Sequence, residues 1–261
     1  MRRSADPTLE VCCPSADFAV AAERAGAGRV ELCDNLAEGG TTPSSGAIEV
    51  ALRDLSIPVM VMIRPRGGDF VYSGSEVDVM LRDIESVARL EVNGRSVLGV
   101  VVGALTPEGA VDARLTRELV AAARPLAVTF HRAFDLSRDL DESLDTLLEI
   151  GVDRVLTSAG RRTAVDGVET LARLAARAMN HAVVLPGGGV RAEHVPRLLG
   201  VPGIRELHIG ASRWTDGPML HRVHDVPMGR AYQPDEYVRE VVDGDRVTSV
   251  AAAMSVSTRA S

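Results

Sequence analysis

The amino-acid sequence predicts a single-domain (β/α)8 barrel over residues 1–261, with the barrel itself spanning about 9–254. Eight short apolar segments suited to β-strands recur along the chain, and seven of them are followed by a helical pattern. Strand starts lie roughly 20 to 40 residues apart, as expected for consecutive βα units. The alternative is a doubly wound open sheet, but that fold usually carries a G-x-G-x-x-G fingerprint after its first strand, and this sequence has none there.

The first quarter of the chain contains two predicted βα units. Leu9–Cys13 (L-E-V-C-C) and Arg29–Asp34 (R-V-E-L-C-D) are short segments of the strand type. The helix predicted over Ser15–Ala25 closes at a glycine. A glycine-rich loop, E-G-G-T-T-P-S, then leads to a helix over about Ser45–Leu55, with Ser44 as its N-cap.

The third strand opens the stretch P-V-M-V-M-I-R-P-R-G-G-D-F at residues 58–70. Strand side chains alternate between two faces, so one face carries three β-branched residues and the other carries Met60, Met62 and Arg64. Arg66 and a Gly-Gly turn follow. Two guanidiniums beside a glycine turn suit an anionic ligand, and the alternative is a pair of surface arginines.

The middle of the chain continues the alternation. A helix is expected over Ser75–Leu90, and Val97–Leu105 is nearly all apolar, as expected for a strand that is buried on both faces. A helix over about Asp112–Ala123 follows. Leu126–Asp135 contains the fifth strand and its exit loop, and the next helix runs to Ile150.

The last three βα units follow the same pattern. Strands are predicted within Arg154–Gly160, Ala182–Val190 and Arg205–Ser212, and helices over Gly167–Met179 and Ala192–Leu199. Beyond them we expect an irregular excursion over 213–234, helical segments near 235–241 and 244–253, and a frayed end. His221 and His224 have an i, i+3 spacing that suits a metal, but we expect them on a solvated surface.

Composition and charge narrow the possible functions. No apolar run reaches about 18 residues and no apolar signal region opens the chain, so neither a membrane span nor secretion is expected. The net charge of −7 argues against nucleic acid as a partner. All 29 basic residues are arginine, which excludes Schiff-base and P-loop lysine chemistry. Three cysteines without a secretory signal favour reduced thiols in the cytoplasm.

The predicted barrel lining is unusually polar. If the β-branched and leucine side chains face the helices, the inward face carries charged, thiol and imidazole groups, whereas barrels are normally filled with Val, Ile and Leu. The inward residues are Glu10, Cys12, Glu31, Cys33, Met60, Met62, Arg64, Thr129, His131, Glu206, His208, Ser212 and one of Thr157 or Ser158. Buried charges must pair with each other, with water or with a ligand, so this lining predicts a functional site.

Two near-identical motifs, L-E-V-C and V-E-L-C, place Cys12 and Cys33 on adjacent strands. Parallel strands lie about 4.8 Å apart, so a matched register would bring the two sulfurs close together. With Met60 and Met62 they would form a soft ligand set of the kind that selects Cu(I). The alternative is that cysteine simply fills a crowded barrel as a small hydrophobe. Cys13 points the other way, and we expect it in the core.

Anion-binding groups are expected at the same end of the barrel. Gly187, Gly188 and Gly189 follow the seventh strand and Ser212 ends the eighth, and barrels commonly bind phosphate in the loops after these strands. We group them with Arg64 and Arg66 as anion-binding candidates. The alternative is that the glycines only serve tight turns.

The sequence resembles the CutC family from about Leu9 to Ser212, and the tail agrees more loosely. The matching segments are L-E-V-C-C, R-V-E-L-C-D-N-L-A-E-G-G-T-T-P-S, P-V-M-V-M-I-R-P-R-G-G-D-F-V-Y, L-A-V-T-F-H-R-A-F-D, R-V-L-T-S and P-G-G-G-V-R. The resemblance implies a cytoplasmic (β/α)8 barrel that forms a homodimer or higher homo-oligomer. It also implies copper homeostasis, with Cu(I) bound by the cysteines of the two E-x-C motifs, here Cys12 and Cys33.

Two functions are therefore expected. The first is Cu(I) binding at Cys12 and Cys33 for copper handling. The alternative is an isomerase, epimerase or lyase that acts on a small anionic or phosphorylated metabolite, with Glu10, Glu31 and His131 as catalytic groups. A divalent metal held by Glu and His side chains would also be compatible with the second function.

Overall fold

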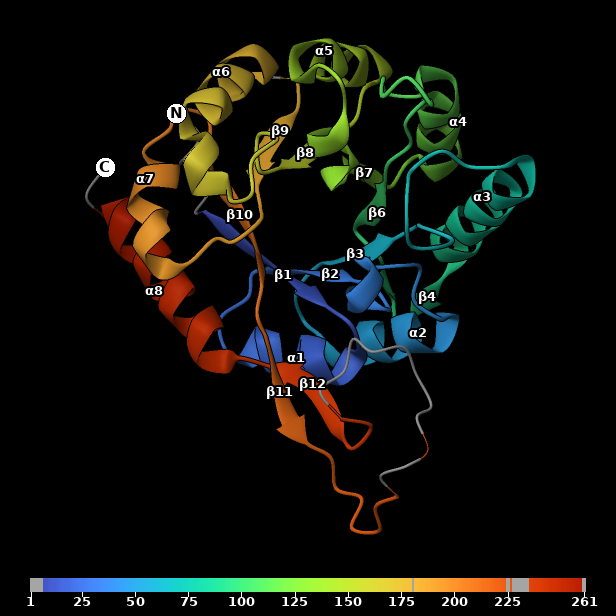
Figure 1. Ribbon diagram of the computed structural model, residues 1–261, viewed down its shortest axis with the longest axis vertical. Coiled ribbons are helices and arrows are strands. Elements are labelled where there is room, and N and C mark those ends of the chain that lie inside the picture. The colour runs from blue at the N-terminus through green and yellow to red at the C-terminus, as the bar shows by residue number, and fades with distance from the viewer. Residues whose placement is uncertain (1–6, 180, 224–225, 227–234, 260–261) are drawn as a thin grey trace.

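The computed structural model of the protein describes residues 7–179, 181–223, 226 and 235–259. Eight parallel strands form a nearly closed barrel with helices around it (Figure 1). The strand order is β10-β1-β2-β3-β6-β7-β8-β9, and its two ends, β9 and β10, lie next to each other. The predicted (β/α)8 class is confirmed.

Each barrel strand falls inside the range predicted for it, except that β1 begins one residue earlier, at Thr8. The barrel strands are β1 (Thr8–Cys13), β2 (Arg29–Leu32), β3 (Val59–Met62), β6 (Gly99–Val102), β7 (Ala127–Phe130), β8 (Arg154–Thr157), β9 (Val183–Pro186) and β10 (Glu206–Gly210). Two further short strands, β4 (Glu91–Val92) and β5 (Arg95–Ser96), form a hairpin before β6.

Most helices begin within one residue of the start predicted for them, but α7 (Val195–Leu199) begins three residues later than predicted, because residues 192–194 form a 3-10 turn. The other helices are α1 (Ala16–Arg24), α2 (Ser45–Asp54), α3 (Gly74–Arg89), α4 (Ala113–Ala123), α5 (Leu140–Ile150), α6 (Val168–Ala178) and α8 (Gly244–Arg259). The Ser44 hydroxyl accepts a hydrogen bond from the amide of Ala47 at 3.2 Å, which confirms the predicted N-cap of α2. Four 3-10 turns, η1 (Leu36–Glu38), η2 (Arg132–Leu136), η3 (Ala164–Gly167) and η4 (Ala192–His194), lie in the loops.

The two faces of β3 enter two different cores. Val59, Val61 and Ile63 are buried in the large core between strands and helices, where each contributes about 1.5–3 kcal/mol. Met60 and Met62 instead belong to a small cluster inside the barrel, as the alternation predicts. Cys13 is fully buried in the large core, which confirms the prediction for this residue.

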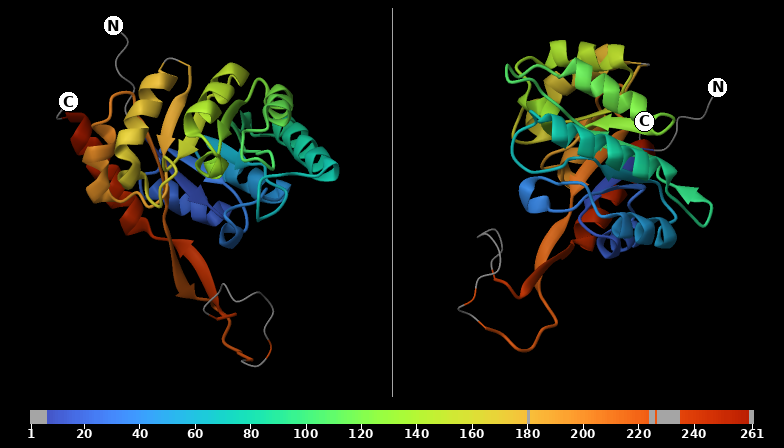
Figure 2. Two further views of the ribbon diagram at one scale, coloured as in Figure 1. Left: turned by 45° about the horizontal axis from the view of Figure 1, so that its top comes forward. Right: turned by 90° about the vertical axis from the view of Figure 1, so that its right-hand side faces the viewer.

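The segment after β10 differs from the prediction. Residues 212–216 form β11 (Ser212–Asp216), which pairs antiparallel with β12 (Val238–Val242), so the helix expected near 235–241 is wrong. The two strands form a ribbon that projects from the barrel (Figure 2). The β12 sequence V-R-E-V-V is rich in β-branched residues, which favour strands. The prediction failed because its pairing partner β11 ends 22 residues earlier in the chain, so the pairing is not visible locally.

Two other features of this end of the chain bear on the predictions. The final helix α8 extends to Arg259, beyond the 244–253 segment expected from the sequence. His221 is exposed, whereas His224 lies outside the described residues. Among the helices described, none combines the length and the apolar character that a membrane span requires.

Candidate functional site

The carboxyl ends of the strands surround a cavity of about 140 Å³. Its polar and sulfur-bearing lining residues are Cys12, Glu31, Met62, Arg64, His131, Arg132 and His208. The volume is close to that of a cavity of about 150 Å³ that holds a benzene molecule. The cavity therefore suits a metal ion or a small organic ligand, because pockets for drug-sized ligands have volumes of about 300–1,000 Å³.

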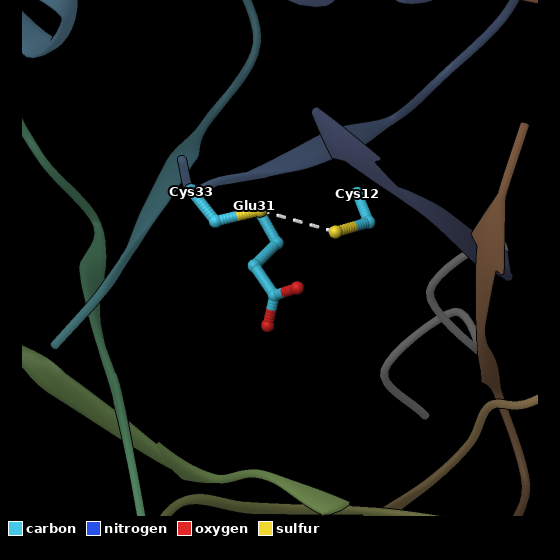
Figure 3. A group of neighbouring side chains, drawn as sticks. All are labelled: Cys12, Glu31 and Cys33. Atoms are coloured by element: carbon cyan, nitrogen blue, oxygen red, sulfur yellow. Dashed lines mark hydrogen bonds between the residues drawn. The ribbon is translucent and has the colours of Figure 1, made fainter. Parts of the chain in front are cut away.

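A pair of thiols lies at the cavity: Cys12 lines it, and Cys33 lies directly behind Cys12. The sulfur atoms of Cys12 and Cys33 are 3.2 Å apart, with the Glu31 carboxylate beside them (Figure 3). The register is not the matched one considered from the sequence, because Cys12 lies opposite Glu31. Barrel strands are staggered, so the two thiols meet diagonally, with the Cys33 amide bonded to the carbonyl of Cys13.

Both thiols hold their protons firmly. The hydrogen bond with Cys33 and burial raise the pKa of Cys12 well above its usual range. The same hydrogen bond lowers the pKa of Cys33, but burial and the charge of Glu31 outweigh it and leave this pKa raised. Deprotonation of the pair therefore requires a cation to replace the proton.

Thioether sulfurs complete a soft environment around Cys33. Met60 and Met62 pack with Cys33 and Val101 in the small cluster inside the barrel. The loop after β2 approaches this cluster at Gly40, whose φ of +90° favours glycine. A Cβ atom at this position would lie 3.5 Å from the Met62 methyl and 3.6 Å from the Cys33 sulfur.

Below the thiols, a buried ion network crosses the barrel. We define the ion network as Glu10, Arg29, Arg154 and Glu206. Arg29 donates to Glu10 and, at 2.5 Å, to Glu206, which also accepts from Arg154 at 2.9 Å. Every charge of the network thus faces an opposite charge.

His208 connects the ion network to the cavity. Its Nδ1 donates to Glu10 at 2.8 Å, while its Nε2 lies 3.8 Å from Glu31. Burial opposes ionisation of Glu10, but the hydrogen bond from His208 and the charge of Arg29 lower its pKa to about 2. Burial also opposes protonation of His208, but Glu31 and Glu10 raise its pKa well above the usual range. Burial raises the pKa of Glu31.

Three side chains, Glu10, Glu31 and His208, also place ligand atoms within 4.8 Å of one another, as a divalent metal would need. Glu10 is already bonded to Arg29 and His208. A metal would have to displace these bonds. Of the two groups of potential metal ligands, the one formed by Cys12, Glu31 and Cys33 has fewer hydrogen bonds and ion pairs to displace.

His131 lies at the carboxyl end of β7 with its ring in the cavity wall. The backbone amide of Ala133 donates to Nδ1 at 3.1 Å, so Nδ1 carries no proton and Nε2 carries one. Burial and the charge of Arg64 lower the pKa of His131 to about 3, which keeps the ring neutral. Nε2 is buried and has no hydrogen-bond partner within the described part of the chain.

Arg64 lies beside His131 and is buried. Its guanidinium donates to three backbone carbonyls, those of Glu38 at 2.7 Å, Gly40 at 2.9 Å and Gly68 at 2.8 Å. These bonds join the loops after β2 and β3, and the guanidinium stacks over Phe70, 4.9 Å from the ring centroid. Its Nε finds no acceptor among the residues that the structure describes.

Comparisons with known proteins identify the family of this chain. The CutC family model matches residues 7–213. The chain belongs to the CutC family. It is 46% identical over 244 residues to the mouse copper homeostasis protein cutC homolog, covering 94% of this chain and 88% of that protein. A CutC family protein of Chromobacterium violaceum is 43% identical over 249 residues, covering 95% and 98% of the two chains.

A solved CutC structure, that of the Streptococcus agalactiae protein, has the same barrel. It is 34% identical to this chain, has a TM-score of 0.70, and covers 78% of this chain and 98% of its own. The resemblance to the CutC family noted in the sequence is therefore confirmed.

In this CutC protein, the structure brings together the predicted residues Cys12, Glu31, Arg64 and His131 around the cavity, with Cys33 in contact with Cys12. It places two others elsewhere. Arg66 is engaged with its own loop and with Glu76, at 2.6 Å, and does not line the cavity. Ser212 lies in β11, opposite Val242.

The glycine loop after β9 lies near the cavity but is partly engaged. The Gly187 amide donates to the carbonyl of Thr157 at 2.9 Å, and Gly188 has a φ of +100°. A Cβ atom at Gly188 would lie 3.2 Å from the Arg132 guanidinium, so this glycine and Gly189, with a φ of +66°, allow the loop to pack closely.

Sequence reasoning missed Arg132, which lines the cavity next to His131. Arg132 donates to Asp135 at 2.7 Å and to Ser158 at 2.8 Å. Asp135 also accepts hydrogen bonds from the hydroxyls of Thr157 and Ser158, so both of these residues help to hold Asp135 at the end of β8. The only sequence signal was the position of Arg132 directly after His131 in T-F-H-R-A-F-D.

Proposed function

We propose that this CutC protein binds Cu(I) as its cargo through Cys12 and Cys33, in the reducing cytoplasm. The distance of 3.2 Å between the two sulfurs is the observation that supports this proposal most directly. Two thiols this close, with Met62 packed beside them, form a soft ligand set, and soft sulfur ligands select Cu(I) over hard divalent ions. The names of the mouse and human relatives point to copper homeostasis as well.

The thiol pair needs little movement to hold a metal ion. Two sulfurs bound to one ion at about 2.3 Å lie roughly 3.8 Å apart with a tetrahedral angle and about 4.6 Å apart in a linear arrangement. Cys12 is less buried than Cys33, and rotation of its side chain can provide the additional separation of about 0.5–1.5 Å. Because both thiols are protonated when free, Cu(I) binding releases protons and strengthens as the pH rises.

An anaerobic Cu(I) titration against a chelator of known affinity tests the proposal. We expect the wild type to bind about one equivalent tightly and Cys33→Ser to lose this binding. Cys13→Ala is the matched control, because Cys13 is buried in the core between strands and helices and has no access to the cavity. Binding that survives in Cys33→Ser, or disappears equally in Cys13→Ala, would contradict the two-cysteine site.

We also propose that the protein forms a homodimer or a higher homo-oligomer through the ribbon that projects from the barrel. Apolar side chains are exposed on and beyond this ribbon, including Trp214 and Leu220, which is 97% exposed. A second copy of the chain would cover them. Sedimentation velocity should show a species of at least twice 27.7 kDa, shifted to the monomer by Leu220→Glu, and a wild-type monomer at micromolar concentration would contradict this assembly.

A further inference from the structure

We propose that the cavity also binds a short hydroxycarboxylate, with its carboxylate on Arg64 and His131 and its hydroxyl on Glu31. This ligand site goes beyond Cu(I) binding, because its contacts come from nitrogen donors of Arg64 and His131 and from a carboxylate oxygen of Glu31, and none comes from sulfur.

The first observation is a buried positive charge without a counter-ion. Arg64 is 4% exposed, and its guanidinium bonds are to the carbonyls of Glu38, Gly40 and Gly68. No carboxylate in the described ranges forms an ion pair with it. Buried charges in proteins are normally paired or bound to a ligand, so an anion is the missing partner.

The second observation is the neutral imidazole beside Arg64. Because Nδ1 of His131 accepts from Ala133, Nε2 carries the ring proton, and the His131 side chain lines the cavity. An unpaired buried donor is costly, and a carboxylate oxygen would satisfy it. The Arg64 guanidinium also lines the cavity and supplies a positive charge for the same carboxylate.

The third observation is an unpartnered carboxylate oxygen, which determines the other end of the ligand. Glu31 lines the same cavity, and its Oε1 has no donor among the residues described. A ligand that satisfies all three groups must carry acceptor oxygens at one end and a hydroxyl donor at the other. Inorganic phosphate fits less well, because its charged oxygens would face the carboxylate of Glu31.

The cavity volume limits the length of the ligand. A cavity of about 140 Å³ is close in size to one that holds a benzene molecule, which is enough for a hydroxy acid of about two to four carbons. Glycolate and lactate are therefore suitable probes. Acetate and propionate are their matched analogues without the hydroxyl, and lactamide is the analogue without the charge.

Isothermal titration calorimetry of the full chain with these probes tests the site. We expect glycolate or lactate to bind, the deoxy analogues to bind about tenfold more weakly, and lactamide not to bind, because each loses one charge-assisted hydrogen bond or the charge itself. The ligand series needs no mutation, so it stays informative if a variant fails to fold. Equal binding of propionate and lactate, tighter binding of inorganic phosphate, or no heat with any hydroxy acid would overturn the proposal.

Variants locate the site within the cavity. His131→Phe keeps an aromatic ring against Phe70 but removes the donor, and it should raise the Kd by about tenfold to a hundredfold. Arg66→Ala is the matched control, since Arg66 does not line the cavity. Cys33→Ser should lose Cu(I) but keep the hydroxy acid, which separates the two proposals. An unchanged Kd in His131→Phe would exclude the Arg64–His131 wall.

Discussion

The ion network and the cavity are both polar regions inside one barrel, yet they differ in how completely their charges are paired. In the ion network, Arg29 bridges Glu10 and Glu206, and Arg154 adds a second cation to Glu206. In the cavity, polar atoms of Glu31, Arg64 and His131 have no partner within the described chain.

This contrast distinguishes a structural from a functional role for buried polar groups. A buried charge costs several kcal/mol unless it is paired, and the ion network satisfies this requirement without a ligand. The cavity does not, although it lies at the strand ends where barrels place their sites. Complete pairing therefore indicates a framework, and incomplete pairing next to a thiol pair indicates a place for a ligand.

The largest expected effect comes from breaking the ion network. Arg29→Met leaves Glu10 and Glu206 with one fewer cation in a buried region, and it should lower the free energy of unfolding by about 3–5 kcal/mol. Urea denaturation measures this change. Arg53→Ala, which breaks an exposed ion pair with Asp54, is the control and should leave the unfolding midpoint unchanged. A loss below about 1 kcal/mol in Arg29→Met would mean that the network is dispensable.

A smaller effect should appear in the pH dependence of stability. His131 takes up a proton near pH 6.5 in the unfolded chain, whereas its folded pKa is lowered to about 3. The unfolded state therefore binds more protons between these values, so acidification destabilises the protein, by about 2–3 kcal/mol from pH 6.5 to pH 4.5. Subtracting the curve of His131→Phe from that of the wild type should isolate this slope. Parallel curves would show that the imidazole is not held neutral.

The smallest effect is expected at Glu31. Its Oε1 has no partner in the described chain and His208 is 3.8 Å away, so Glu31→Gln should change the free energy of unfolding by less than about 1 kcal/mol. The same substitution at Glu10 removes a carboxylate that accepts from both Arg29 and His208, and it should cost at least about 2 kcal/mol. Equal losses in the two variants would remove the distinction between the cavity and the ion network.

Much of the site was predictable because strand alternation is a local property. Val59, Val61 and Ile63 point to the helices, and Met60, Met62 and Arg64 point inward, as a period of two requires. The same rule placed Glu10, Glu31, His131 and His208 inside the barrel.

The sequence by itself determined which face each strand residue occupies and the order of the βα units, since both follow from side-chain periodicity along the chain. The tertiary structure decided which inward groups meet. The stagger of β1 against β2 places Cys12 opposite Glu31, so the two thiols meet diagonally. Pairing with β11 stabilises residues 238–242 as a strand. Arg64 and Arg66 are two residues apart, but only the first reaches the cavity, because the surrounding loops engage the second. Contacts between distant segments depend on register and loop path, which no local pattern specifies.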